Sequence, residues 1–537
     1  MLGVGDILIM SKSTKSTLAK AAGTVACLTV VNKTLGFFRE ASLAAVFGAT
    51  SATDAYLVAQ TIPNLLFATI SYALTTTFIP VYSHVREERG SGAAFGFACN
   101  VLGAVLVLGL AFVVIGEVLA DFLVGLVAPG FEGTVAALTA YLCRIIFPMM
   151  IFQLLSGVMT GILQAHGEFA VSTAAGLVQN VTIIASILVF GPHYGIASVA
   201  VGALVGAGLA TVVKITVLPR TGFRLTGAFS PRDPGIRRMA VLMLPAIVGA
   251  GAGQLNTLAD RILASGLPEG RVSALNYANK LMQLAPGIFG TSILTVTYPT
   301  LARMTAQEKW ESFSSGLVDA LSLVYFFLAP IAVGVVVLRE PLIRIVYQRG
   351  GFDTAATEQT ARALLFLGLG IGIFTMRDLV SRAFFTMQDT TTPALVGFMT
   401  VGINVVLNLL LVGPLEQGGL ALATTVASLV GLVTSLLVLN RRSPAPLPLR
   451  RLASSVVRTG FAALVMGFVV WAVQGYISTL YVHGTAMELV FLILVVGIGA
   501  GVYSGLAWFL RVPCLKMVVE AALQMSRRMR FVSRGSP

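Results

Sequence analysis

Apolar stretches of about 20 residues recur along the whole chain, and each is long enough to cross the ~30 Å hydrocarbon core of a bilayer. Of the 537 residues, 56% are hydrophobic and only 11% are charged, whereas soluble domains are about 25% charged. The mean hydropathy of +0.88 agrees with this composition. We therefore expect an all-α polytopic membrane protein, in which no loop is long enough for a soluble catalytic domain.

The lysines and arginines indicate how the chain crosses the membrane. We predict fourteen transmembrane helices, with both ends of the chain in the cytoplasm. Of the 36 Lys and Arg residues, 24 then fall on inside segments or within three residues of a cytoplasmic span end, and four fall on outside loops, in agreement with the positive-inside rule. The net charge of +13 thus reflects topology, and we expect no nucleic-acid partner. The predicted spans cover residues 22–48, 54–80, 95–118, 135–162, 170–190, 196–217, 237–265, 273–301, 315–337, 358–387, 393–413, 418–440, 456–476 and 487–511.

An internal repeat is visible at an offset of 222 residues, where "LVFGP" at 188–192 matches "LLVGP" at 410–414. It implies two parallel six-helix halves, which place a pseudo-two-fold axis along the membrane normal and a cavity between the two lobes. We divide the chain into a cytoplasmic tail (1–21), an N-lobe of spans one to six (22–217), a basic cytoplasmic linker (218–236), a C-lobe of spans seven to twelve (237–440), a basic cytoplasmic loop (441–455), two extra spans (456–511) and a basic cytoplasmic tail (512–537).

Charged residues inside the spans are the strongest functional signal. Each ionised group near a bilayer centre costs roughly 2.5–3.5 kcal/mol on insertion scales, so such groups line an interior or a watery cavity. Leaving out groups near the span ends, we take as intramembrane the basic residues Lys33, Arg39, Arg144, Arg261, Lys280, Arg362, Arg377 and Arg382 and the acidic residues Glu40, Asp260 and Asp378. The excess of positive charge predicts an anionic ligand, because Arg and Lys are the usual phosphate binders.

Two simpler interpretations apply to these charges. The stretch "VNKTLGFFRE" at 31–40 would also be explained by salt bridges that only lock helices together. Asp378 and Arg382 are spaced i, i+4, and we expect them to pair with each other.

A second polar group lies in the spans near the end of the repeat. Asn404 and Asn408 of "GINVVLN" lie one turn apart on one helix face. With Asp260 and the hydroxyl of Thr424, they would form an oxygen site for a hard monovalent cation. The alternative is interhelical hydrogen bonding by the two asparagines. The four cysteines show no metal-ligand spacing, and the four histidines lie in loops or at span ends.

Three stretches resemble the MurJ (MviN) family of the multidrug/oligosaccharidyl-lipid/polysaccharide exporter superfamily. They are "NKTLGFFREASLAAVFGATSATDAYLVAQTIPNLL" (32–66), "LNYANKLMQLAPGIFG" (275–290) and "FFTMQDTTTPA" (384–394). The resemblance implies a V-shaped two-lobe cavity with basic residues that bind a pyrophosphate, and a groove for a polyprenyl tail beside the two extra spans. It also implies a sodium site formed by the positions of Asp260, Asn404, Asn408 and Thr424.

The basic residues of the family map onto individual positions of this chain. The first falls on Lys33, the second on Arg39, followed by Glu40, and the third on Lys280. We add Arg261, which the repeat aligns with Arg39, to this predicted substrate-binding set. The fourth falls on Phe67, which has no charge, and this departure leaves the exact headgroup open.

The predicted function is a flippase that moves lipid II, an undecaprenyl-pyrophosphate-linked peptidoglycan precursor, across the bacterial cytoplasmic membrane by alternating access. It would be a transporter and not an enzyme, with no cofactor other than the sodium ion, and its partners would be the lipid precursor, the bilayer and the cell-wall synthesis machinery. Three alternatives stay open: a flippase for another polyprenyl-linked glycan, a cation-coupled drug antiporter, and a membrane enzyme acting on polyprenyl phosphates. The antiporter would need acidic cavity groups, and the enzyme a cluster of carboxylates or histidines in a loop.

Overall fold

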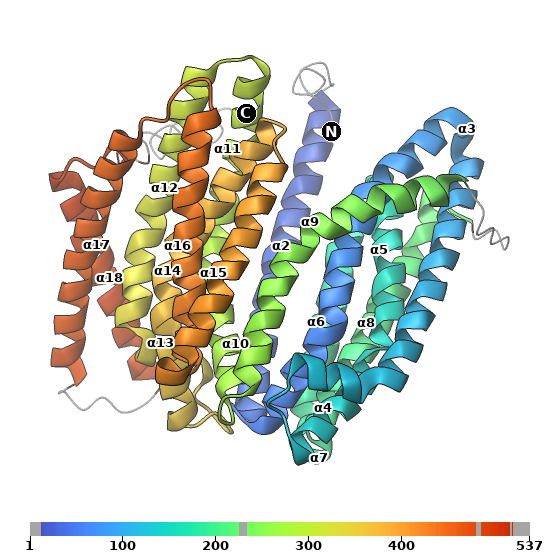
Figure 1. Cartoon of the computed structure of the whole chain (residues 1–537), viewed down its shortest axis with the longest axis horizontal. Helices are drawn as coiled ribbons and strands as arrows, with labels where there is room; N and C mark the ends of the chain where they lie inside the picture. Colours follow the sequence, from blue (N-terminus) through green and yellow to red (C-terminus); the bar gives the residue numbers. More distant parts are fainter. Residues whose placement is uncertain (1–11, 225–233, 479–484, 516–517, 519–537) are drawn as a thin grey trace, which may run out of the picture. The chain divides into compact units, whose positions relative to one another are not determined.

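The computed structural model describes residues 12–224, 234–478, 485–515 and 518, and all regular structure in these residues is helical (Figure 1). Most of the predicted tails and part of the basic linker lie outside the described residues. The chain forms two compact units, each described here by itself. The first unit is Met1–Ser273 with Arg349–Asp353, and the second is Ala274–Gln348 with Thr354–Pro537.

The first unit is a bundle in which α2 packs on α6 and α3 packs on α4, α5 and α9. Its helices are α2 (Lys12–Phe47), α3 (Ser51–Val127), α4 (Gly133–Ile146), α5 (Met149–Ala165), α6 (Phe169–Ala185), η1 (Ser186–Phe190), α7 (Gly191–Tyr194), α8 (Ala197–Val217), η2 (Leu218–Thr221) and α9 (Pro234–Ser265). The core of this bundle is a cluster of buried apolar side chains, among them Phe78, Tyr82, Phe97 and Leu154.

Two predicted spans fall within the single long helix α3. A straight helix of 77 residues would be about 115 Å long, far more than a bilayer requires. The backbone of α3 breaks at Gly90, where φ is 82° and ψ is 172°, a conformation open almost only to glycine. Figure 1 shows α3 as two arms that run in opposite directions. The predicted spans 54–80 and 95–118 lie on either side of this break.

Prolines interrupt two other spans that we predicted as continuous. The predicted span 135–162 consists of α4 and α5, which meet at Phe147 and Pro148. The predicted span 273–301 consists of α10 (Arg271–Met282) and α11 (Thr291–Ala306), with the π-helical turn η3 (Pro286–Gly290) before α11. Proline has no N–H to donate to the helix, so the helical hydrogen bonding is lost at these points.

The second unit is built around α12, α14 and α16. Helix α12 packs on α14 and α17, α16 packs on α14 and α15, and α17 packs on α18. The bounds are α12 (Trp310–Val337), α13 (Arg339–Tyr347), α14 (Thr354–Thr386), α15 (Thr391–Leu415), α16 (Gln417–Arg442), α17 (Leu449–Ser478) and α18 (Thr485–Phe509). The two extra predicted spans are α17 and α18, and Tyr503 of α18 donates to the Phe326 carbonyl of α12 at 2.7 Å. Helix α13 lies where we predicted only a connection.

Ten helices of the described chain are long and apolar enough to cross a membrane, so the prediction of an all-α, multi-pass membrane protein is confirmed. The number of fourteen spans stays a prediction, as do the lobe boundaries and the V-shaped cavity. Helix α9, which the repeat assigns to the C-lobe, packs on α3 within the first unit (Figure 1).

The third stretch of family resemblance ties two helix ends together in the second unit. Asp389, just before α15, accepts hydrogen bonds from the Thr392 backbone N–H at 2.9 Å and from the Thr392 hydroxyl at 2.6 Å. The same carboxylate pairs with Arg442, the last residue of α16, at 2.7 Å. Asp389 therefore caps the start of α15 and holds the end of α16.

We expect Asp389→Asn to lower the free energy of unfolding by about 1 kcal/mol, because it removes a charged cap and an ion pair. Burial raises the pKa of Asp389, but hydrogen bonds from Thr392 and the charge of Arg442 outweigh it, so the pKa lies below its ordinary value. A carboxyl group with a lowered pKa stabilises the folded state above pH about 4, and this contribution is lost as the pH falls through the folded-state pKa.

The melting temperatures of the purified wild type and Asp389→Asn, measured in detergent between pH 8 and pH 3, check this expectation. The two curves should run apart from pH 8 down to about 5 and approach each other below about 4. A difference that does not change with pH would show that the Asp389 carboxylate makes no charge-dependent contribution.

Candidate functional site

Arg39 and Glu40 form a close ion pair on α2, with 2.7 Å between Arg39 Nη2 and Glu40 Oε1. The Glu40 side chain is 8% exposed and the Arg39 side chain is 28% exposed. Arg39 Nη1 donates a second hydrogen bond, of 3.2 Å, to Oδ1 of Asn180 on α6. A buried charge without a partner destabilises a protein by several kcal/mol, so this pairing explains how α2 carries both groups. The guanidinium is held at two points and stays partly exposed.

A second arginine of the predicted set lies in the same unit. Arg261 on α9 interacts electrostatically with Asp54, Asp260 and Glu40. Glu40 is therefore shared between an arginine of α2 and an arginine of α9. The structure thus brings three of the predicted residues together, namely Arg39, Glu40 and Arg261.

Asp54, near the start of α3, belongs to this charged group, and the sequence analysis missed it. Its side chain is buried and accepts hydrogen bonds from the backbone N–H groups of Gly270 and Ser273, each at 2.7 Å. These amides lie at the beginning of α10, where the positive end of the helix dipole favours a carboxylate. The position of Asp54 at a predicted span end was a signal for a cap, but it gave no indication of a partner more than 200 residues away.

Lys33 is exposed on α2, two helical turns before Glu40. Close to Arg39 and Arg261 there are three carboxylates, Glu40, Asp54 and Asp260, whereas Lys33 lies about 10 Å before Glu40 along α2. The expected excess of positive charge is therefore absent from this group of described residues. This group would bind an anion mainly through oriented N–H donors and less through its net charge.

The remaining candidates lie in the second unit, apart from Asp260 on α9 in the first. Lys280 lies on α10 and is partly buried. Asn408 donates to Asn404 Oδ1 at 2.9 Å, and Asn404 donates to the Thr424 hydroxyl on α16 at 3.1 Å. The structure therefore joins three of the four predicted sodium ligands through hydrogen bonds. The bond from Asn404 to Thr424 connects α15 with α16, so it also agrees with the alternative interpretation, in which the asparagines only form hydrogen bonds between helices.

The other basic residues within the spans have local partners. The predicted pair of Asp378 and Arg382 is confirmed at 3.4 Å. Arg362 pairs with Glu358 at 2.7 Å on the exposed face of α14, and Arg377 donates to the hydroxyl of Ser428 at 3.4 Å. Arg144 pairs with Asp121 at 2.7 Å.

Phe67, at the position where the family resemblance calls for an arginine, packs against the apolar core of the first unit. The side chain thus contributes to packing, and the position offers no group to an anion.

Three loops of the first unit meet through backbone contacts at glycines. A Cβ atom on Gly270 would lie 2.4 Å from the Ala49 carbonyl oxygen, and one on Gly350 would lie 2.2 Å from the Ala45 carbonyl oxygen. Both glycines have positive φ, of 82° and 58°. The Gly351 N–H donates to the same Ala45 carbonyl at 2.7 Å. We call these contacts the loop junction, and they allow the chain segments to approach more closely than any side chain would permit.

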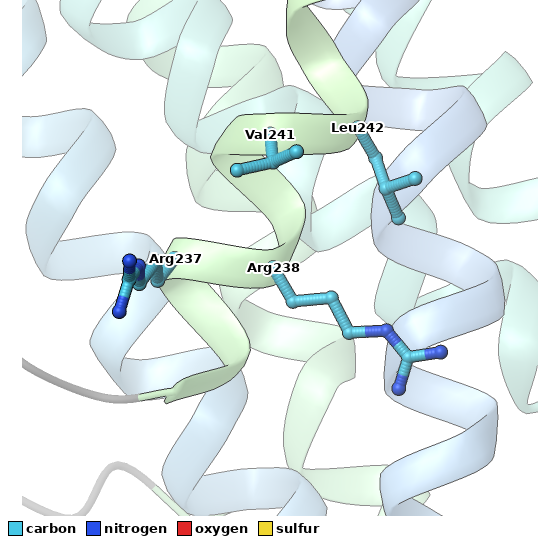
Figure 2. Close-up of a pocket in the computed structure, with 4 residues that line it drawn as sticks. All are labelled: Arg237, Arg238, Val241 and Leu242. Atoms are coloured by element: carbon cyan, nitrogen blue, oxygen red, sulfur yellow. The ribbon is translucent and has the colours of Figure 1, made fainter.

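A surface pocket of about 330 Å³ lies near the start of α9 (Figure 2). It is lined by Arg237, Arg238, Val241 and Leu242, and Figure 2 shows the two arginine side chains pointing to opposite sides of the helix. Arg237 and Arg261 are 24 residues apart on α9, about 36 Å along its axis. This pocket is therefore separate from the charged group around Arg39.

Comparisons with solved structures show which known folds this chain resembles. A structure of lipid II flippase MurJ in an inward closed conformation matches with a TM-score of 0.77 and 24% identity, covering 91% of this chain and 98% of that one. An inward-facing multidrug resistance MATE family transporter of the MOP superfamily matches with a TM-score of 0.64 and 14% identity, covering 76% and 94%. The chain therefore shares its fold with these two transporters.

The family itself follows from sequence comparison. The family model described as "Lipid II flippase MurJ" matches residues 43–492. The probable lipid II flippase MurJ of Rhizobium meliloti (strain 1021) is 31% identical over 425 residues, which is 77% of this chain and 79% of that protein. The chain belongs to the lipid II flippase MurJ family.

We expect Gly270→Ala to destabilise the loop junction by about 2–4 kcal/mol, because the new Cβ atom would meet the Ala49 carbonyl and the positive φ would be strained. Gly222→Ala is the matched control, since Gly222 has a φ of 79° but no atom within 4 Å of a built Cβ. The control should lose only the ~1 kcal/mol of backbone strain. Thermal unfolding in detergent compares the two variants, and equal losses would contradict a steric role of the junction.

Proposed function

We propose that this chain moves lipid II, the lipid-linked peptidoglycan precursor, from the inner to the outer leaflet of the bacterial cytoplasmic membrane. The observation that carries the proposal is the match of residues 43–492 to the lipid II flippase family model. The chain is a multi-pass membrane transporter rather than an enzyme. Its product would supply cell-wall synthesis, and contact with the synthesis machinery stays a prediction.

The charged group of the first unit supplies donors for the pyrophosphate of such a lipid. Arg39 is held by Glu40 and Asn180, so its orientation is set before a ligand arrives. A guanidinium that is already oriented loses less conformational freedom when it binds a phosphate oxygen. We assign Arg39, Lys33 and Arg261 as phosphate-binding residues in the first unit and Lys280 in the second, with Glu40 as the group that orients Arg39.

Alternating access requires the outer end of the transporter to open and close. The positive-inside assignment places the segments of the loop junction on the outer side of the membrane. The junction is held by backbone contacts at glycines and by the hydrogen bonds of Asp54 to Gly270 and Ser273. Contacts of this kind separate without exposing a large apolar surface, and this supports the junction as the part that opens outward.

Another polyprenyl-pyrophosphate-linked glycan is the second candidate substrate. The packing of Phe67 in the apolar core favours it, because the position where the family resemblance expects an arginine cannot bind an anion here. A drug antiporter receives less support, since each of the carboxylates near Arg39 and Arg261 already has a cationic or backbone partner.

The proposal includes an orientation with both ends of the chain in the cytoplasm. It is supported by the 24 basic residues on inside segments or at cytoplasmic span ends, against four on outside loops. Labelling of a cysteine introduced at the C-terminal end with a membrane-impermeant thiol reagent tests this orientation.

A sodium ion is the one cofactor that we propose. Asn404, Asn408 and Thr424 carry amide and hydroxyl oxygens within hydrogen-bonding distance of one another, and such neutral oxygens suit a hard monovalent cation. Asp260, the fourth predicted ligand, lies on α9 in the first unit, and its part in the site stays a prediction. A bound ion would hold α15 and α16 together and add one positive charge to the second unit.

We expect sodium to raise the melting temperature of the purified protein by a few degrees relative to potassium, because ligand binding stabilises the folded state. Asn404→Leu should abolish this difference. Ser435→Ala, at a buried hydroxyl on α16 outside the proposed ligands, is the control and should retain it. Equal melting temperatures of the wild type in both salts, up to several hundred millimolar, would remove sodium from the proposal.

The substrate assignment is tested by complementation of a bacterium depleted of its own lipid II flippase. We expect the wild type to restore growth and Arg39→Ala to fail, because the variant loses the oriented donors and removes the ion-pair partner of Glu40 on α2. Arg39→Lys should restore growth only partly, since an ammonium lacks the bidentate geometry of a guanidinium.

Arg362→Ala is the control for this experiment, because Arg362 pairs with Glu358 on an exposed face of α14. It should restore growth like the wild type. Full growth with both Arg39→Ala and Lys280→Ala would contradict the proposed phosphate site. No growth with a correctly inserted wild type would favour the other polyprenyl-linked glycan.

A further inference from the structure

Asn180 on α6 connects two residues of α2 through a single carboxamide. Its Oδ1 accepts from Arg39 Nη1 at 3.2 Å, and its Nδ2 donates to Asn32 Oδ1 at 2.9 Å. Asn32 and Arg39 are seven residues apart, so they lie on the same face of α2, about 10 Å apart along its axis. One amide on α6 therefore spans two turns of the helix that carries Arg39.

The chemistry of Arg39 fixes the orientation of both amides. A guanidinium has only N–H donors, so Asn180 must present its oxygen to Arg39 and its NH₂ group to Asn32. Asn32 must then accept with its own oxygen. Asparagine carries an acceptor and a donor far enough apart to make both contacts at once, whereas leucine has neither and the single hydroxyl of serine is too short to reach both partners.

Gly176, one turn before Asn180 on α6, provides the space that this arrangement needs. A Cβ atom at Gly176 would lie 2.8 Å from Nδ2 and 3.2 Å from Oδ1 of Asn32. The amide of Asn32 therefore lies directly against the backbone of α6. The packing of α2 on α6 is built around this contact as well as around the hydrogen bonds of Asn180.

We propose that Asn180 is a positioning residue of the substrate site, whose carboxamide fixes the Arg39 guanidinium so that its other N–H donors face the diphosphate of the lipid. The inference rests on the proposed function. Within the described residues, Arg39 makes the two hydrogen bonds to Asn180 and Glu40, which leaves the other three of its five N–H donors for phosphate oxygens. Glu40 holds the Nη2 group of the guanidinium, and Asn180 holds its Nη1 group.

Asn180→Asp separates this role from simple packing. An aspartate still accepts from Arg39, and the Asn32 amide can turn to donate to it, so the helices should stay joined. The new carboxylate, however, is a second negative charge on the same guanidinium and repels a diphosphate. If Asn180 only joined α2 to α6, this variant would be stable and would bind the lipid normally.

The test measures the Kd of purified lipid II for the full-length protein in detergent, together with its melting temperature. Asn180→Asp should keep the melting temperature of the wild type and raise the Kd about tenfold or more. Asn180→Ser removes the bridge without adding charge and should raise the Kd about threefold or more. The control is Gln179→Glu, which adds the same charge one residue away, where the side chain packs against Gly206 of α8, and its Kd should stay within about twofold.

Three results would overturn the inference. The first is a Kd within twofold of the wild type for both Asn180 variants. The second is an equal loss of affinity in Gln179→Glu, which would show a general effect of charge on α6. The third is a large fall in melting temperature for Asn180→Asp, which would contradict the described geometry. If the wild type itself does not bind lipid II, the proposed function fails together with this inference, whereas normal binding in the variants removes the inference alone.

Discussion

The pairing of Arg39 with Glu40 is the interaction on which the arrangement of the first unit depends. A lone charge is costly within an apolar bundle, so each of these groups requires a partner. Their partners come from three helices, since Arg39 also binds Asn180 of α6 and Glu40 also interacts with Arg261 of α9. The charges that bind a substrate in the proposed function are therefore the same charges that hold α2, α6 and α9 in place.

Close contacts and turns at glycines are the second feature that recurs in this structure. At Gly176 it brings an amide of α2 against α6, and at Gly270 and Gly350 it brings loops together in the loop junction. At Gly90 the lack of a side chain allows the long helix α3 to break into two arms. In each case the chain gains an approach or a turn that a Cβ atom would block. Such contacts are short-range and directional, which suits segments that have to separate and meet again in a transport cycle.

The balance of charge around Arg39 changes the expected mode of anion binding. Counting charges along the sequence indicates an excess of positive charge, but Asp54 and Asp260 interact with Arg261 and offset its charge. Affinity for a diphosphate would then come from donors held in fixed directions, because each oriented N–H strengthens a charge-assisted hydrogen bond in a medium of low polarity. Selectivity for one headgroup over another depends on this geometry, and it makes the apolar Phe67 compatible with a pyrophosphate ligand.

The helical membrane class, the family and the helix that carries the key charges were predictable from the sequence, because apolar length, basic loops and the stretch around Arg39 are local properties. The pair of Asp378 and Arg382 was predictable as well, because residues four apart lie next to each other on a helix surface. The contact of Asn180 with Arg39 and the capping of α10 by Asp54 became visible in the folded structure alone, since 141 and more than 200 residues separate these partners. Contacts over such distances depend on how helices pack, and a single sequence carries no periodic signal for them.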